Sequence, residues 1–189
     1  GVGTLHLYTA GFAETGDDDR SHMQKILVDT AKNSGVRILG PNCMGIYSPK
    51  AGISFCPDFP ADAGHVGFIS QSGSYSLLVV RAAAARGVRF SKMVSYGNAC
   101  DIDECDLLEY LGHDKETKII AAYIEGTRDG NRLRKVLIEA ASKKPVIIIK
   151  KGHTEAGKRG ASSHTGAMAG DDKVWDAMIR QAGAIRVED

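Results

Sequence analysis

The chain has 189 residues, 43% hydrophobic and 25% charged, which is ordinary for a globular protein of one or two domains. Its formal net charge of +1 at pH 7 gives no sign of a protein that binds nucleic acid or a membrane surface. No apolar run approaches the roughly 18 residues that a membrane helix needs, and no secretory signal opens the chain. The four cysteines lack zinc-ligand spacing, so we expect reduced thiols, no metal site and a cytoplasmic location.

The first part of the chain predicts a β-α-β unit. Residues 4–9 form the first expected strand, which turns at Ala10-Gly11-Phe12. A helix with apolar residues at helical spacing follows, and it ends at Gly35. Residues 36–39 form the second expected strand and lead into the loop 40–45. Both loops follow the carboxyl ends of parallel strands, which is where open sheets of this kind bind ligands.

Residues 47–63 break the pattern with prolines and glycines, and we interpret them as a connector between two domains, 1–63 and 64–189. In the second domain, strands alternate with helices. The expected strands are 66–69, 89–95, 118–124, 145–150 and 184–187. The first expected helix follows the segment 70–74 and ends at about residue 86, and the others cover about 102–111, 131–141 and 171–181. This alternation predicts an α/β fold with a flavodoxin-like, doubly wound parallel sheet.

The first candidate site is the motif Ser70-Gln71-Ser72-Gly73. It follows a strand and opens a helix, so its backbone N–H groups and the helix dipole can bind an anion. The serines at positions 70, 72 and 74 can add hydroxyl donors. The alternative is an ordinary N-cap, which a helix needs whether or not it binds a ligand.

The second candidate is His164, in a loop of small residues that follows the strand 145–150. A neutral imidazole can act as a nucleophile or a general base, and the alternative is a solvated histidine without a role. In a parallel sheet this loop emerges on the same edge as the Ser70 motif. Glu125 follows the strand 118–124 and emerges there too, where its carboxylate can orient the imidazole. The alternative for Glu125 is an exposed acid paired with Arg128.

Four motifs occur in a set order along the chain. They are Gly40-Pro41-Asn42-Cys43-Met44-Gly45, Ile69-Ser70-Gln71-Ser72-Gly73, Tyr123-Ile124-Glu125-Gly126 and Ser163-His164-Thr165-Gly166-Ala167-Met168-Ala169-Gly170. Each is weak alone, but together they resemble the NDP-forming acyl-CoA synthetases, relatives of the succinyl-CoA synthetase α subunit. The resemblance covers essentially the whole chain. It implies the C-terminal half of a Rossmann-like CoA-binding domain, followed by a flavodoxin-like domain that carries a phosphohistidine.

The resemblance also implies a role for each candidate residue. His164 is expected to carry the phosphoryl group, and Glu125 to orient that histidine. The residues expected to bind phosphate are Ser70, Ser72, Gly73, Ser74 and Gly166. The residues expected to lie at the CoA site are Ala10, Gly11, Asn42 and Cys43. Cys43 has a competing interpretation as a small buried side chain, and we do not expect it to be catalytic.

The implied reaction is that of an acid–thiol ligase, which converts acid, CoA and ATP or GTP into acyl-CoA, ADP or GDP, and phosphate. The family's glycine-rich nucleotide loop and its ATP-grasp part, which binds the nucleotide and Mg²⁺, are missing from this sequence. We therefore expect turnover to need an ATP-grasp domain or a β-type subunit, in an oligomer. The acid stays open among acetate, a branched or aromatic acid and a dicarboxylate, and so does the choice between ADP and GDP.

Two other functions compete with this one. The first is a non-catalytic, CoA-sensing regulatory module, but such modules are expected to lack the histidine that this chain has at position 164. The second is a flavodoxin-like domain that binds a flavin or a nucleotide phosphate. It would need aromatic side chains near the Ser70 motif, and Tyr75 and Tyr96 are the close candidates.

Overall fold

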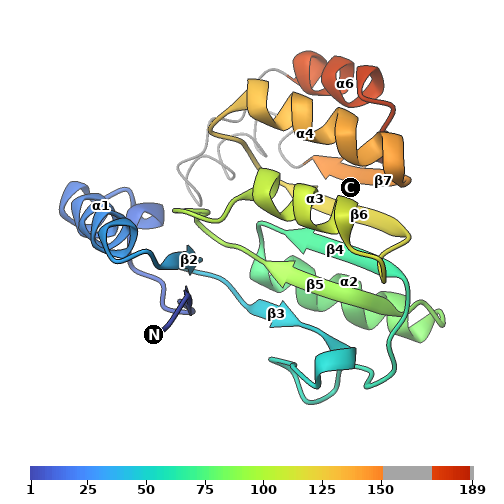
Figure 1. The fold of residues 1–189 in the computed structure, drawn as a ribbon, viewed down its shortest axis with the longest axis horizontal. Helices are drawn as coiled ribbons and strands as arrows, with labels where there is room; N and C mark the ends of the chain where they lie inside the picture. Colours follow the sequence, from blue (N-terminus) through green and yellow to red (C-terminus); the bar gives the residue numbers. More distant parts are fainter. Residues whose placement is uncertain (151–171, 188–189) are drawn as a thin grey trace.

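A computed structural model describes residues 1–150 and 172–187, which form two lobes (Figure 1). The small lobe holds the strands β1 (Thr4–His6) and β2 (Arg37–Leu39) and the helix α1 (Asp18–Asn33). The large lobe, from residue 45 onward, contains the strands β3 (Gly45–Tyr47), β4 (Val66–Ser70), β5 (Phe90–Ser95), β6 (Ile119–Ile124), β7 (Val146–Lys150) and β8 (Ile185–Val187). Its helices are α2 (Gly73–Ala85), α3 (Glu104–His113), α4 (Gly130–Lys143) and α6 (Asp172–Gln181). Two short 3₁₀ turns lie at Ala13–Thr15 and Pro49–Ala51.

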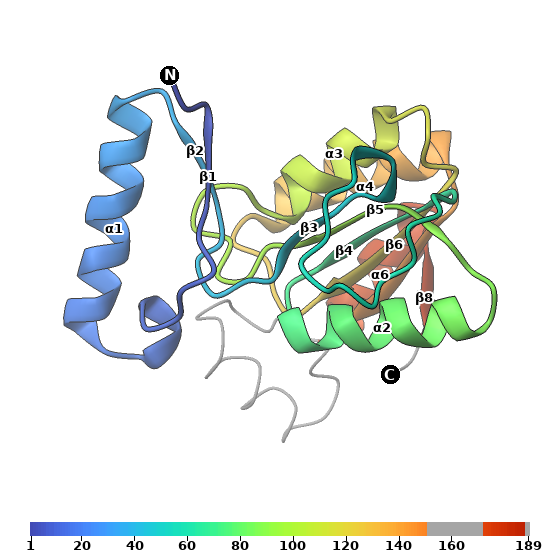
Figure 2. The same ribbon diagram turned by 90° about the horizontal axis from the view of Figure 1, so that it is seen from below.

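The large lobe is a six-stranded sheet with the order β3-β5-β4-β6-β7-β8. The strands from β4 to β8 run parallel, and β3 pairs antiparallel with β5 at the edge. The five parallel strands follow the flavodoxin order, in which the first strand lies between the second and the third. In Figure 2, α2 covers one face of this sheet and α3 and α4 cover the other. The predicted doubly wound α/β fold is confirmed.

The sheet separates two hydrophobic clusters. The larger one lies under α3, α4 and α6, and its buried members include Leu108, Leu137, Trp175 and Ile179. The other lies under α2, and its buried members include Tyr47, Phe59, Phe68 and Val80. Buried apolar residues on both faces of the parallel strands explain why these strands read as nearly continuous apolar runs in the sequence.

The segment interpreted as a connector contributes more to the large lobe than its sequence pattern indicated. Its first residue, Tyr47, ends the edge strand β3, in which Gly45 lies opposite Ser95 of β5. Tyr47, Cys56 and Phe59 are buried in the cluster under α2. A strand of three residues leaves almost no alternation to detect, and the prolines around it hide the apolar positions. The first strand is also shorter than expected, since β1 ends at His6 rather than at residue 9.

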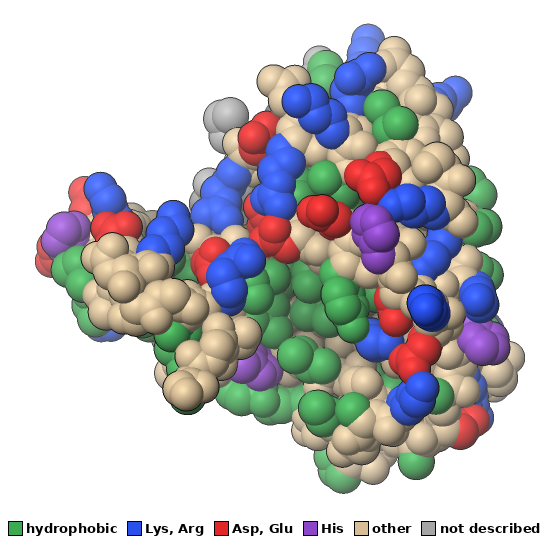
Figure 3. All heavy atoms as spheres, viewed as in Figure 1, with side chains coloured by type: hydrophobic (Ala, Val, Ile, Leu, Met, Phe, Trp, Pro, Cys, Tyr) green, Lys and Arg blue, Asp and Glu red, His purple; other side chains and the backbone are tan. Residues whose placement is uncertain are grey.

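Ion pairs link the small lobe to the large one at the junction, where Figure 3 shows acidic and basic side chains gathered together. The Arg37 guanidinium on β2 lies 2.9 Å from a carboxylate oxygen of Asp101 and 2.9 Å from one of Asp106. The same Asp101 carboxylate accepts the Ile38 backbone N–H at 2.7 Å. The loop between β5 and α3 is therefore tied directly to β2.

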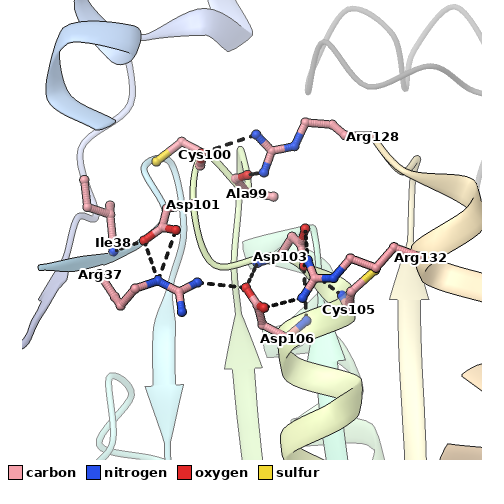
Figure 4. Close-up of polar contacts among 10 residues, drawn as sticks. All are labelled: Arg37, Ile38, Ala99, Cys100, Asp101, Asp103, Cys105, Asp106, Arg128 and Arg132. Carbon is pink, nitrogen blue, oxygen red and sulfur yellow. Dashed lines mark hydrogen bonds and ion pairs between the residues drawn. The ribbon is translucent and has the colours of Figure 1, made fainter. Parts of the chain in front are cut away.

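Figure 4 shows that α4 completes this network. The Arg132 guanidinium lies 3.0 Å from Asp103 and also pairs with Asp106. Asp103 and Asp106 form a capping box at the start of α3, which fixes where that helix begins. Arg128 donates to the backbone carbonyl oxygens of Ala99 and Cys100. Among the described residues, no helix is both long and apolar enough to cross a membrane.

Candidate functional site

Three strands of the large lobe end side by side. In the parallel sheet β4 and β7 lie on either side of β6, with Ser70 opposite Tyr123 and Ile124 opposite Lys150. The loops that follow these strands therefore start on one edge of the sheet, as the sequence predicted. His164 and Gly166, which lie beyond β7 in the chain, fall outside the described residues.

The N-terminus of α2 lies at this edge, and its serines play different structural roles. The Ser72 side chain is the N-cap and accepts the Tyr75 N–H at 3.3 Å. The Ser70 hydroxyl is buried and donates to the Ser72 backbone oxygen at 2.7 Å. Ser74 is exposed, with its hydroxyl 3.4 Å from that of Ser72. The first-turn N–H groups of a helix, here including those of Gly73 and Ser74, have no intrahelical acceptor. They are the groups best suited to a phosphoryl oxygen.

Gly73 also lets a second loop approach this helix closely. A Cβ at position 73 would lie 2.6 Å from the Met44 Cγ, inside van der Waals contact. Met44 follows the predicted CoA residues Asn42 and Cys43, so the predicted CoA loop touches the first residue of α2.

Glu125 is buried at the end of β6, with 4% of its surface exposed. The alternative interpretation as an exposed acid paired with Arg128 is therefore wrong, because the Arg128 guanidinium binds carbonyl oxygens of the β5–α3 loop instead. The pKa of the neighbouring Tyr96 hydroxyl is raised well above its usual value, chiefly by burial and then by the charges of Glu104 and Glu125. Burial likewise raises the pKa of the Glu104 carboxyl. The edge is thus a poorly solvated environment with acidic groups.

Lys150 is the last residue of β7 and lies beside Glu125. Its ammonium is buried and lies 5.0 Å from the centroid of the Trp175 ring, within cation–π range. Burial lowers the pKa of Lys150 to about 8, although the charges of Asp172 and Glu125 act in the opposite direction. The sequence alone assigned Lys150 no role, because an isolated lysine at a strand end carries no signal of its burial.

The predicted CoA residues lie in the small lobe and at its junction with the large lobe. Asn42 adopts a left-handed backbone with φ of 56°. Its side-chain amide donates to the side-chain oxygen of Asn98 at 3.2 Å. Cys43 is buried, and burial raises its pKa to about 11, so at neutral pH it is a thiol rather than a nucleophilic thiolate. The backbone N–H groups of Gly11 and Phe12 both donate to the Glu14 carboxylate. Ala10, immediately before them, is exposed.

Asn98 joins these loops, and the sequence had not assigned it a role. Its amide donates to Glu14 at 2.5 Å and to Gln24 at 2.9 Å, and it also accepts from Asn42. The backbone N–H of Tyr96, two residues earlier, donates to the Ser70 oxygen at 3.0 Å. The β5–α3 loop therefore connects the predicted CoA loops to the predicted phosphate site.

The two tyrosines that were candidates for a flavin site are both packed against the protein. Tyr75 stacks on Tyr123 with ring centroids 4.0 Å apart. Tyr96 is fully buried in the cluster under α3. The Tyr96 ring is thus covered by the protein, and one face of the Tyr75 ring is covered by Tyr123.

Comparison with known proteins identifies the family. The sequence model of the succinyl-CoA ligase like flavodoxin domain matches residues 63–189. The chain belongs to this family. The chain is 43% identical over 185 residues to the α subunit of ADP-forming acetate–CoA ligase II of Pyrococcus furiosus, covering 98% of this chain and 40% of that relative. It is 42% identical over 188 residues to the ADP-forming acetate–CoA ligase of Methanocaldococcus jannaschii, covering 98% of this chain and 26% of that relative.

A solved structure shows the same architecture. It is the dinucleotide forming acetyl-coenzyme A synthetase 1 of Ca. Korarchaeum cryptofilum, in complex with phosphate and ADP. It matches with a TM-score of 0.88 and 34% identity, over 98% of this chain and 40% of that one. The resemblance to NDP-forming acyl-CoA synthetases is confirmed, and the chain spans less than half the length of these relatives.

Proposed function

We propose that the chain is part of an NDP-forming acyl-CoA synthetase that works through a phosphohistidine at His164. The observation that carries this proposal is the adjacency of three strand ends, where β6 brings the buried Glu125 beside the loop that opens α2. The neighbouring strand β7 leads into the segment that contains His164. One edge of the sheet thus supplies an orienting carboxylate and an anion-binding helix N-terminus.

The reaction proceeds by three displacements in the direction of acyl-CoA synthesis. A ring nitrogen of His164 attacks the terminal phosphorus of the nucleoside triphosphate, and the bond to the diphosphate oxygen breaks. An oxygen of the carboxylic acid then attacks this phosphorus, which breaks the N–P bond and gives an acyl phosphate. The CoA sulfur finally attacks the acyl carbon and releases inorganic phosphate, which takes up the thiol proton.

The residues of this chain have defined parts in these steps. Glu125 accepts the N–H of the imidazole nitrogen that does not react, so that the other nitrogen presents its lone pair. The N–H groups of Gly73 and Ser74, supported by Ser70 and Ser72, hold the phosphoryl oxygens at the positive end of α2. Gly166 completes the phosphate contacts. Ala10, Gly11, Asn42 and Cys43 border the CoA thiol.

The remaining parts lie outside this sequence. We propose that residues 1–63 belong to the CoA-binding domain and residues 64–189 to the phosphohistidine domain. An ATP-grasp part, on the same chain or on a β-type subunit, binds ATP or GTP with Mg²⁺ and completes an oligomeric enzyme. The setting we propose is the cytoplasm, in keeping with four cysteines that are all free thiols.

The test is phosphoryl transfer in the complete ligase, in which this chain is combined with its nucleotide-binding part. Incubation with ATP labelled at the γ-phosphate is expected to label this chain with a group that is acid-labile and base-stable. The variant His164→Ala should abolish the label. A matched control is His113→Ala on α3, whose exposed imidazole lies 2.7 Å from the Lys143 ammonium, and it should leave labelling unchanged. Label that survives His164→Ala refutes the proposal.

A panel of acids then identifies the substrate class. The complete ligase is assayed for CoA-dependent release of nucleoside diphosphate with acetate, a branched acid, an aromatic acid and a dicarboxylate. One of these classes is expected to give turnover that requires both CoA and His164. Release that is independent of CoA contradicts the proposed ligase reaction while leaving the phosphohistidine intact.

A further inference from the structure

The backbone around Glu125 is held from the side of β4 by Gln71. The Gln71 side-chain oxygen accepts the N–H of Glu125 at 2.8 Å and that of Gly126 at 3.2 Å. The Gln71 backbone N–H donates to the Tyr123 oxygen at 3.0 Å, which continues the ladder between β4 and β6. Beyond that point β4 turns away toward α2. The side chain of Gln71 therefore replaces the backbone acceptor that a longer strand would supply.

The same backbone is held from the side of β7 by Lys150. Its ammonium donates to the Glu125 backbone oxygen at 2.7 Å. Gln71 and Lys150 are each only 4% exposed, so both contacts are made in a poorly solvated environment. A hydrogen bond from a charged donor in such an environment is stronger than an ordinary one and costly to lose. The Glu125 N–H is thus bonded by the residue that follows β4, and its backbone oxygen is bonded by the last residue of β7.

We propose that Gln71 and Lys150 are positioning residues that hold the Glu125 carboxylate at a set place relative to the α2 N-terminus. This inference rests on the proposed function, in which Glu125 orients His164. Gln71 lies between Ser70 and Ser72, so the residue that clamps Glu125 belongs to the loop that binds phosphate. A shift of the clamped backbone moves the carboxylate away from the imidazole while the phosphate site stays in place. A displacement of about 1 Å at such a site lowers the rate by about 100-fold.

The test uses single-turnover phosphorylation of the complete ligase by labelled ATP. Gln71→Met keeps the length of the side chain but removes the amide oxygen that two N–H groups share. Phosphohistidine formation is expected to slow by about 100-fold at a temperature where circular dichroism shows the variant folded. The matched control is Thr117→Val, which removes a buried hydroxyl that bonds Ser91 at 2.7 Å at the opposite edge of the sheet. Its rate should equal that of the wild type.

A double-mutant cycle separates positioning from general stability. If Gln71 acts through Glu125, Gln71→Met should slow a Glu125→Gln ligase by less than about 3-fold, because there is no carboxylate left to misplace. Both single variants should also move the acid limb of the pH–rate profile to lower pH, since a nearby carboxylate raises the pKa of an imidazole. Full additivity of the two changes overturns the inference.

Lys150→Met provides the same cycle from the other side of Glu125. It keeps an apolar chain against Trp175 while it removes the ammonium, and it replaces Gln71→Met if that variant does not fold. A wild-type ligase that is never phosphorylated on His164 refutes the proposed function. A wild-type ligase that is phosphorylated, with variants at Gln71 and Lys150 that react at the same rate, overturns only the positioning role.

Discussion

The two lobes bury their apolar residues to very different extents. In the large lobe the sheet is covered on both faces, and Leu108, Ile120 and Trp175 belong to one extended cluster. The small lobe has a two-stranded parallel sheet and one helix, and among the described residues its own buried apolar cluster consists of Ala31, Ile38 and Cys100. Cys100 comes from the β5–α3 loop of the large lobe. A two-stranded sheet is marginal by itself, so the small lobe depends on the junction for part of its core.

The exposed face of α1 points to the same conclusion. Met23 and Ile26 are 50% and 52% exposed, although they occupy apolar positions of an amphipathic helix. The capping residue Asp17, which accepts the Arg20 N–H at 3.0 Å, fixes where the helix begins but adds no core. The N-cap of α1 is formed by an aspartate, as are those of α3 and α4 in the large lobe, so the local helix signals of the two lobes are similar. What distinguishes the lobes is tertiary burial, and four variants test this distinction.

The largest effect is expected from removing core volume. Leu108→Ala should lower the free energy of unfolding of the large lobe by about 4 kcal/mol, because Leu108 is fully buried and leaves a cavity. The chain has one tryptophan, Trp175, whose fluorescence follows the large lobe during urea unfolding. Ile38→Ala, equally buried but in the small lobe, should leave that transition in place. Equal shifts of the Trp175 transition would show that the lobes unfold as one unit.

The next effect is expected at the contact between loops. A Cβ at Gly97 would overlap the carbonyl oxygens of Pro41 and Asn42, and the backbone there has φ of 55°. Gly97→Ala should therefore destabilise the protein by about 3 kcal/mol and increase hydrogen exchange across α1. The control is Gly87→Ala, which has φ of 77° and open space around it, and should cost about 1 kcal/mol. Similar costs for the two variants would mean that the loops are not in close contact.

A pH-dependent effect is expected from the large lobe. Lys150 loses its proton at a pKa of about 8 when folded and at its ordinary value of 10.5 when unfolded. Between these values the unfolded state binds more protons, so this group makes stability rise with pH across that window. From pH 7 to pH 10.5 the unfolding free energy of the wild type should therefore rise by about 2 kcal/mol relative to that of Lys150→Met, after allowance for solvent screening. Lys135→Met, at an exposed position of α4, is the control. A difference that does not change with pH would contradict the low pKa.

The smallest effect is expected at the junction itself. Asp101→Asn weakens the bond to Arg37 and the acceptor of the Ile38 N–H, and should cost about 1 kcal/mol of small-lobe stability. Hydrogen exchange of the amides of α1 and β2 measures this loss. Asp58→Asn breaks an exposed pair with Arg81 and should leave the exchange of α1 unchanged. If Asp101→Asn also leaves that exchange unchanged, the ion pairs do not stabilise the small lobe.

Much of the fold was readable from the sequence because its signals are local. Strands read as short apolar runs, helices as periodic segments, and the turn from β4 into α2 at Ser72 is marked by an N-cap residue followed by glycine. The convergence of the loops after β4, β6 and β7 also followed, since parallel strands present their carboxyl ends on one edge. The strand β3 could not be predicted, because three residues carry too little alternation and its partner strand β5 is distant in sequence.

The candidate site, too, was only partly predictable from the sequence. The sequence alone determined the fold class, the order of the elements, and which residue types gather at one edge of the sheet, including Glu125 and the serines of α2. Only the tertiary structure decided that Glu125 is buried rather than paired with Arg128, that Gln71 and Lys150 clamp its backbone, and that Asn98 joins the loops of both lobes. The reason is physical: periodicity and capping depend on neighbours in the chain, whereas burial and the partners of a polar side chain depend on segments that are distant in sequence.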